Sequence, residues 1–175
     1  PKLFDENVNS CAIRITYGDF RYFNGGDLSG GAQKDLYKAK DRDMETPVAK
    51  VCGKVDVAKA NHHGYYDTCN GFFLNTVSPD VMIIDARSQN HPVPPTMARM
   101  VDHMVWPGKG EFYITVDQPR QKLGEELWSH FKPWGHIVVR VYEGGEKYQV
   151  FVLDADSLDY HIIYTSDVKK AGNNR

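Results

Sequence analysis

The strongest constraint on the fold is an unbroken apolar run, Val81 to Ile84 (Val-Met-Ile-Ile), which aspartates bound on both sides. Such a run is typical of a fully buried strand, as in the parallel sheets of α/β proteins. The polar loop that follows it, Asp85 to Pro95, then lies at the carboxyl end of the strand, where α/β proteins place their ligands. The sequence therefore predicts an α/β (α+β) fold with a ligand site beside this loop.

A second predicted strand, Val55 to Ala60, is followed by two histidines and a glycine, His62-His63-Gly64. Because side chains alternate between the faces of a strand, the two histidines cannot both continue the same face. Gly64 lets the backbone turn immediately afterwards. Either histidine could point into a pocket while the other supports it. The alternative is a strand end capped by two solvated imidazoles.

Two further polar residues follow predicted strands. A hairpin of residues 10–17 and 20–23 ends at Gly26-Asp27, and His91 lies in the loop after the buried strand. Asp27 alone could equally be a helix N-cap. If one sheet gathers the loops that follow its strands at one edge, Asp27, the paired histidines and His91 converge there.

A carboxylate and neutral imidazoles are suitable ligands for zinc or a similar divalent ion. An aspartate can bridge two metals, and bound metal lowers the pKa of water towards about 7. The chemistry implied is hydrolysis of an ester, amide or phosphodiester. Tyr65 and Arg87 border the predicted site and are candidate substrate contacts, although loop aromatics often only pack.

The composition excludes several classes of protein. A chain of 175 residues with 41% apolar residues fits one folded domain and argues against disorder. No apolar run approaches the roughly 18 residues of a membrane helix. The net charge of -2 reveals no basic stripe, so nucleic-acid binding is possible but unsupported. Cys11, Cys52 and Cys69 lack metal-ligand spacing and are expected to be mostly buried free thiols.

The spacing of apolar residues predicts the other elements. They are helices at Asn70–Val77, Pro95–Met104 and Arg120–Phe131, and strands at Phe112–Val116, Gly135–Tyr142, Tyr148–Leu153 and Tyr160–Thr165. The charged stretch 32–50 is predicted to be a short solvated helix and then a surface loop that ends near Pro47. Residues 166–175 are predicted to be a frayed tail.

The order of these motifs resembles the metallo-β-lactamase superfamily, and most closely the branch that includes the soluble domain of the DNA-uptake protein ComEC and related bacterial hydrolases. That branch carries an Asn-Ser strand, a Gly-Asp after the next strand, an aspartate-led strand ending in His-His-Gly and a later His-Pro. The matching residues here are Asn9-Ser10, Gly26-Asp27, Asp56 through His62-His63-Gly64, and His91-Pro92. The likeness covers Asn7 to Asp102 and continues loosely through the later hairpin.

The resemblance implies that residues 1–175 form a single partial domain, the second half of an αββα sandwich with a mixed sheet and flanking helices. It implies one or two zinc ions, or manganese. Asp27 matches the bridging carboxylate, while His91 and one histidine of the 62–63 pair match metal-site or proton-transfer positions. His62 and His63 are therefore the candidate catalytic residues, and Asp27, His63 and His91 the candidate metal ligands.

The chain departs from the family in one important respect. The principal metal motif of the superfamily, His-x-His-x-Asp-His, is absent, and in the family it precedes everything seen here. Since the chain also begins with Pro1, we expect a carboxyl-terminal fragment that needs its own amino-terminal half or a second chain. Zinc sites normally need at least three protein ligands, so we expect the chain alone to hydrolyse nothing. The alternative is a non-catalytic binding or structural module of the same fold.

Overall fold

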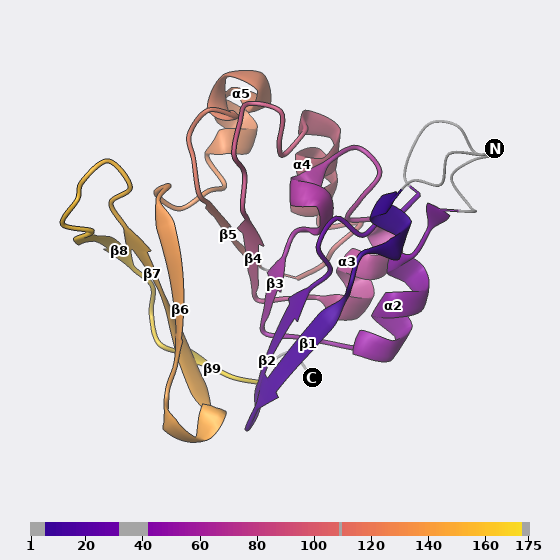
Figure 1. The fold of residues 1–175 in the computed structure, drawn as a ribbon, viewed down its shortest axis with the longest axis horizontal. Coiled ribbons are helices and arrows are strands. Elements are labelled where there is room, and N and C mark those ends of the chain that lie inside the picture. The colour runs from indigo at the N-terminus through magenta and orange to yellow at the C-terminus, as the bar shows by residue number, and fades with distance from the viewer. Residues whose placement is uncertain (1–5, 32–41, 109, 173–175) are drawn as a thin grey trace.

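The computed structural model describes residues 6–31, 42–108 and 110–172. These residues form a five-stranded mixed sheet, a small antiparallel sheet and several short helices (Figure 1). The predicted α/β class, with a mixed sheet and flanking helices, is confirmed.

The five-stranded sheet has the strand order β1-β2-β3-β4-β5. Its first two strands form an antiparallel hairpin, whereas β2, β3, β4 and β5 run parallel to one another. The predicted hairpin and buried strand are both confirmed, and Val81 and Met82 on β4 are completely buried. The five strands are β1 (Ile13–Tyr17), β2 (Phe20–Asn24), β3 (Val57–Lys59), β4 (Val81–Ile84) and β5 (Glu111–Ile114).

Alternation along the parallel strands supplies one hydrophobic cluster to each face of this sheet. Ala58 and Met82 belong to the cluster that packs under the helices. Val57 and Val81, which directly precede these two residues, belong to the cluster shared with the small sheet. Figure 1 shows the helices and the small sheet on opposite sides of the five-stranded sheet, which therefore forms the middle layer.

The helices lie at α2 (Glu45–Cys52), α3 (Gly71–Val77), α4 (Pro94–Val101) and α5 (Arg120–Trp128), with short 3-10 turns at η1 (Glu6–Asn9), η3 (Asn61–Gly64) and η4 (Glu143–Gly145). The predictions of α3, α4 and α5 are confirmed. The prediction of a loop up to Pro47 is wrong, because α2 already begins at Glu45. The Asp43 carboxylate accepts hydrogen bonds from the backbone N–H and hydroxyl of Thr46, which stabilises that first turn. Residues 32–41, where the solvated helix was predicted, lie outside the described residues.

The small sheet consists of β6 (His136–Val141), β7 (Lys147–Leu153), β8 (Ile162–Thr165) and β9 (Lys169–Lys170), with β7 in its centre. Every second residue of β7 is buried, beginning with Tyr148, whose ring lies 5.2 Å from that of Phe20. The predicted hairpin of β6 and β7 and the predicted strand at β8 are confirmed.

The end of the chain differs from the predicted frayed tail. Lys169 and Lys170 pair with β7, and the buried Ala171 donates its backbone N–H to Glu146 at 2.8 Å. The N–H of Gly172 donates to the Asp56 carboxylate at 2.6 Å. The pairing of β9 with β7 and these backbone hydrogen bonds therefore hold residues 166–172 in the fold. Residues 173–175 lie outside the described part of the chain.

The cysteine prediction is confirmed in part, because Cys52 and Cys69 are buried free thiols but Cys11 is exposed. Within the described ranges, none of the helices is both long and apolar enough to cross a membrane.

Candidate functional site

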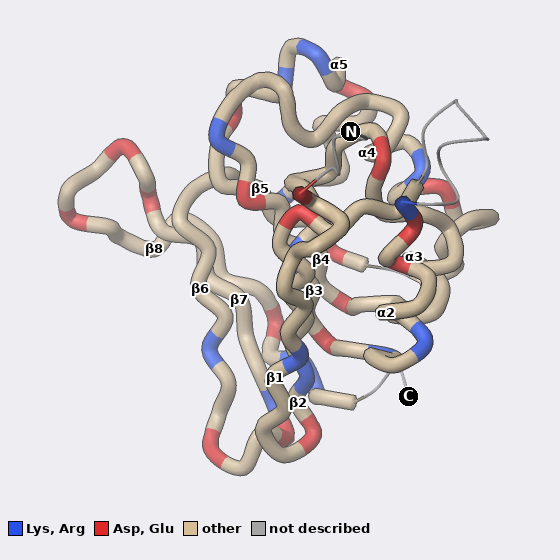
Figure 2. The backbone as a smooth tube through the Cα atoms, turned by 45° about the vertical axis from the view of Figure 1, so that its right-hand side comes forward, with Lys and Arg blue, Asp and Glu red and all other residues tan. Residues whose placement is uncertain are grey.

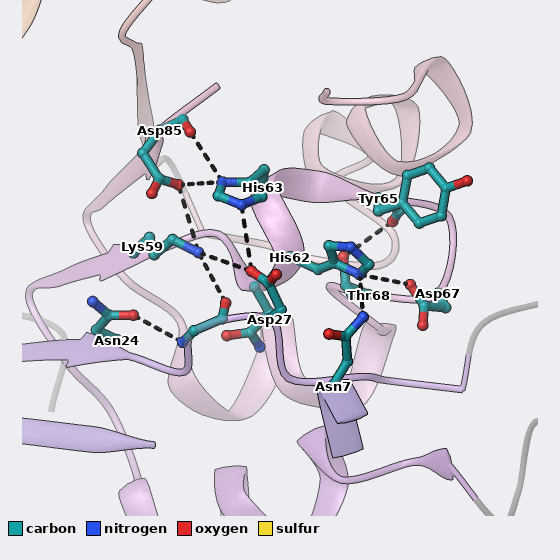
Figure 3. A network of polar contacts seen from close by, with 12 residues as sticks. Asn7, Asn24, Asp27, Lys59, His62, His63, Tyr65, Asp67, Thr68 and Asp85 are labelled. Atoms are coloured by element: carbon teal, nitrogen blue, oxygen red, sulfur yellow. Dashed lines mark hydrogen bonds and ion pairs between the residues drawn. The ribbon is translucent and has the colours of Figure 1, made fainter. Parts of the chain in front are cut away.

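Three neighbouring parallel strands bring a histidine and two carboxylates together at their carboxyl ends. Asp27 follows β2, His63 follows β3 and Asp85 follows β4 directly (Figure 3). His63 Nε2 lies 3.3 Å from Asp27 Oδ1, and His63 Nδ1 lies 2.9 Å from Asp85 Oδ1. The expected convergence is therefore present in the structure for Asp27 and His63, together with Asp85, a carboxylate that sequence reasoning missed.

The environment of His63 fixes which ring nitrogen carries a proton. Nδ1 faces only acceptors on Asp85, the carboxylate at 2.9 Å and the backbone carbonyl at 3.0 Å, so Nδ1 donates. In the neutral imidazole, Nε2 then presents a lone pair to the oxygen of Asp27. Two acceptors facing each other need a shared cation, which is either a proton or a metal ion. The hydrogen bond to Asp85 raises the pKa of His63, which favours the imidazolium form with a proton on both ring nitrogens.

A buried lysine lies between the two carboxylates. Lys59, the last residue of β3, donates from Nζ to the Gly26 carbonyl at 2.8 Å. The same ammonium lies 3.5 Å from Asp85 Oδ1 and 3.9 Å from Asp27 Oδ1. Sequence reasoning missed Lys59, although a lysine among the small and apolar residues of a short strand was the available signal. Its charge offsets the repulsion between the carboxylates.

The paired histidines diverge because both residues have left-handed backbone dihedrals. The φ angles are 45° at His62 and 54° at His63, a conformation that costs non-glycine residues roughly 1–2 kcal/mol each. His62 turns away from Asp27, and its Nδ1 lies 3.5 Å from both Asp67 Oδ1 and Asn7 Nδ2 (Figure 3). Asp67 in turn accepts a hydrogen bond from the Ser29 hydroxyl at 2.9 Å. Sequence reasoning missed Asp67, which holds His62 from outside the motif.

His91 completes a cluster of aromatic rings around the turn. Its ring centre lies 5.5 Å from that of His63, 5.9 Å from that of His62 and 5.2 Å from that of Tyr65. Burial and then the neighbouring imidazoles lower the pKa of His91, which favours the neutral ring at neutral pH. A neutral imidazole is the form that can bind a metal or accept a proton.

A groove of about 540 Å³ opens beside these rings. His62, Tyr65, His91 and Lys122 are among the side chains that line it. The candidate substrate contact Tyr65 therefore faces the same space as His62 and His91. Arg87 does not line this groove; it borders a separate hollow with Trp134 and His136.

The described residues alone do not form a complete metal site. No group of three or more His, Cys, Asp or Glu side chains among them is arranged to hold one ion. Asp27 and His63 can supply two ligands, and the ring centre of His91 lies 5.5 Å from that of His63. Because zinc normally needs at least three protein ligands, the remaining ligands have to come from elsewhere if a metal is bound.

Comparison with known proteins finds no family model that matches the chain and no matching curated protein. The fold and the site define an α/β protein that carries a histidine clamped between two aspartates at the carboxyl edge of its parallel strands.

Proposed function

We propose that this chain is the carboxyl-terminal half of a metal-dependent hydrolase with the metallo-β-lactamase fold. The observation that carries the proposal is the contact between His63 Nε2 and Asp27 Oδ1 at 3.3 Å. One ion bound there would satisfy both acceptors. The motif order on neighbouring strands, from Gly26-Asp27 through His-His-Gly to His91-Pro92, supports the same reading.

The fold supports the proposal that a further layer completes an αββα sandwich. Ile13, Ile15 and Tyr17 project from one face of β1, and they are 52%, 54% and 51% exposed. Single exposed apolar residues are common, but three in a row on one edge strand form a face that further chain would cover. In this proposal the missing half supplies that cover and the remaining metal ligands.

Each site residue has a role that follows from its contacts. Asp27 and His63 would hold the ion, and Asp85 keeps the proton of His63 on Nδ1 so that Nε2 remains available. When bound, zinc or manganese would supply a water of lowered pKa. Lys59 balances the carboxylate charge, and His62, held by Asp67, lines the groove where a substrate would lie.

The groove leaves the substrate class broad. Tyr65 offers an aromatic surface and Lys122 a positive charge, which together suit an ester or phosphodiester of a small molecule. Figure 2 shows basic and acidic residues interspersed over the described part of the chain, so the charge pattern does not favour nucleic acid as the substrate.

The second candidate function is a non-catalytic binding or structural module of the same fold. The ammonium of Lys59 favours it, because a cation already lies within 3.9 Å of Asp27 and 3.5 Å of Asp85. In such a module the polar cluster only closes the end of the sheet.

The two candidates are separated by restoring the upstream half and measuring metal content and hydrolysis of bis(p-nitrophenyl) phosphate and p-nitrophenyl acetate. We expect the present chain to be inactive and the completed protein to bind zinc or manganese and to hydrolyse one probe. Asp27→Asn should abolish both properties in the completed protein. A completed protein that contains no metal would favour the module.

A further inference from the structure

A buried carboxylate lies beneath the site without taking part in it. Glu45 is completely buried, and its oxygens accept three hydrogen bonds from neutral groups. Asn61 Nδ2 donates to Oε1 at 2.8 Å, the Cys69 N–H donates to the same oxygen at 2.6 Å, and the Asn70 N–H donates to Oε2 at 2.7 Å. Buried glutamates are rare in proteins unless they are paired, so this one calls for a reason.

The groups around Glu45 belong to the segments that carry the site. Asn61 directly precedes His62, and Cys69 lies two residues after Asp67. The N–H of Glu45 donates to the Ser29 carbonyl at 3.2 Å, on the loop that carries Asp27. Glu45 therefore ties the histidine turn to the aspartate loop through direct bonds on both sides.

The junction leaves little room for adjustment. A Cβ atom added to Gly30 would overlap the carboxylate of Glu45, and one added to Gly25 would overlap the side chain of Asn61. The His62 N–H also donates to the Gly26 carbonyl at 3.0 Å. A displacement of the Glu45 carboxylate would therefore be transmitted to Asn61 and on to the histidines, because the intervening space is filled.

We propose that Glu45 is a positioning residue that sets the spacing between Asp27 and His63. Its carboxylate acts through Asn61 and its backbone N–H through the Ser29 carbonyl, and none of these hydrogen bonds reaches Asp27 or His63 directly. The functional meaning of that spacing rests on the proposed function, but the geometric claim does not. Burial raises the pKa of Glu45 to about 7, although the three hydrogen bonds act in the opposite direction. The fold thus keeps an ionisable group where an apolar side chain would avoid desolvation.

The test compares Glu45→Ala and Glu45→Gln with Val77→Ala in the chain as it stands. Val77 is completely buried in the same cluster under the helices, on α3, so it controls for lost packing. The readouts, at one fixed pH, are the ring ¹H–¹³C signals of His62 and His63 and the hydrogen exchange of the His62 amide. The ring signals are not expected to respond to a general loss of stability alone, and the exchange rate of each variant is compared with its measured change in global stability.

We expect Glu45→Ala to move both ring signals and to speed exchange at the His62 amide about tenfold beyond the change in global stability. Glu45→Gln keeps an acceptor for Asn61 and Cys69 but turns an amide against the Asn70 N–H, so its shifts should be smaller and in the same direction. Val77→Ala should leave the ring signals in place. If Glu45→Ala does not fold, Glu45→Gln carries the same comparison.

Ring signals that stay in place in both Glu45 variants would overturn the inference and reduce Glu45 to a structural tie. Failure of the proposed function is recognised separately, by the absence of metal from the completed protein. That result would leave the positions of the rings in the Glu45 variants unaffected.

Discussion

The two sheets of this protein differ in how closely their residues follow the usual preferences for burial, charge and backbone conformation. The small antiparallel sheet alternates buried and less buried residues along β7 (Lys147–Leu153), as a half-buried strand should. The carboxyl edge of the parallel strands breaks several rules at once, with a buried lysine at Lys59, a buried acid at Glu45 and left-handed backbone at two histidines. Departures from local preference concentrate at functional sites, so the contrast supports the proposed function of this edge.

The largest expected effect is on the stability that packing between the two sheets provides. Tyr148 is completely buried between the sheets, and Tyr148→Ala should lower the free energy of unfolding by about 3–5 kcal/mol, the range for large aromatic deletions. Urea unfolding measures the loss. The ring signals of His62 and His63 should not move in the folded variant. Signals that do move would show that the two regions are not independent.

The next effect is a pH dependence that belongs to Glu45. Its pKa is raised to about 7, above the unfolded value of roughly 4.3, so the folded state binds the extra proton between these values. The contribution to stability is fully present below the unfolded pKa and is lost as the pH rises through 7. Relative to Glu45→Gln, the wild type should therefore lose up to about 3 kcal/mol between pH 4.5 and pH 8. A difference that stays flat in denaturant titrations across this range would contradict the raised pKa.

Removing the charge of Lys59 should have a somewhat smaller effect. Lys59→Met keeps most of the buried stem but leaves Asp27 and Asp85 without their shared cation, which should cost about 1–3 kcal/mol. Chemical denaturation at pH 7 gives the value. Addition of zinc or manganese should restore part of it if the carboxylate edge accepts a cation. A variant as stable as the wild type would mean that Lys59 only fills space.

The smallest effect concerns the clamp on His63. Hydrogen bonding to Asp85 raises the pKa of His63 above the usual value near 6.5, so its stabilising contribution is present below that pH and is lost as the pH rises through the folded value. The stability difference between wild type and His63→Gln should thus shrink from pH 6 towards pH 9. Chemical denaturation of both proteins across this range gives the difference, and a value that stays constant with pH would contradict the clamp.

Much of the fold follows from local sequence pattern. Burial is indicated directly by the apolar run Val81–Ile84 and by the spacing of apolar residues along the later helices. Each element shows in its own sequence which of its faces is apolar. The convergence of Asp27 with the His-His-Gly turn was predictable for a related reason: parallel neighbours place the residues after their strands at one edge.

The contacts of the site could not be predicted in the same way. Lys59 reaches Gly26 and Asp85, and Glu45 reaches Asn61, across long separations in the sequence that depend on strand register and loop paths. The sequence predicts a loop up to Pro47, where the structure has the first turn of α2. Pro47 lies in the first turn, where backbone N–H groups have no helical partner and proline is tolerated.

We propose that His63 and Asp27 form one side of a metal site that another segment completes. Elemental analysis of the protein with its upstream half restored tests it most directly, with Asp27→Asn in the same background as the matched control. We expect one or two equivalents of zinc or manganese in the completed protein and loss of the metal in the variant. A completed protein that folds without metal, or one whose metal content is unchanged by Asp27→Asn, would contradict it.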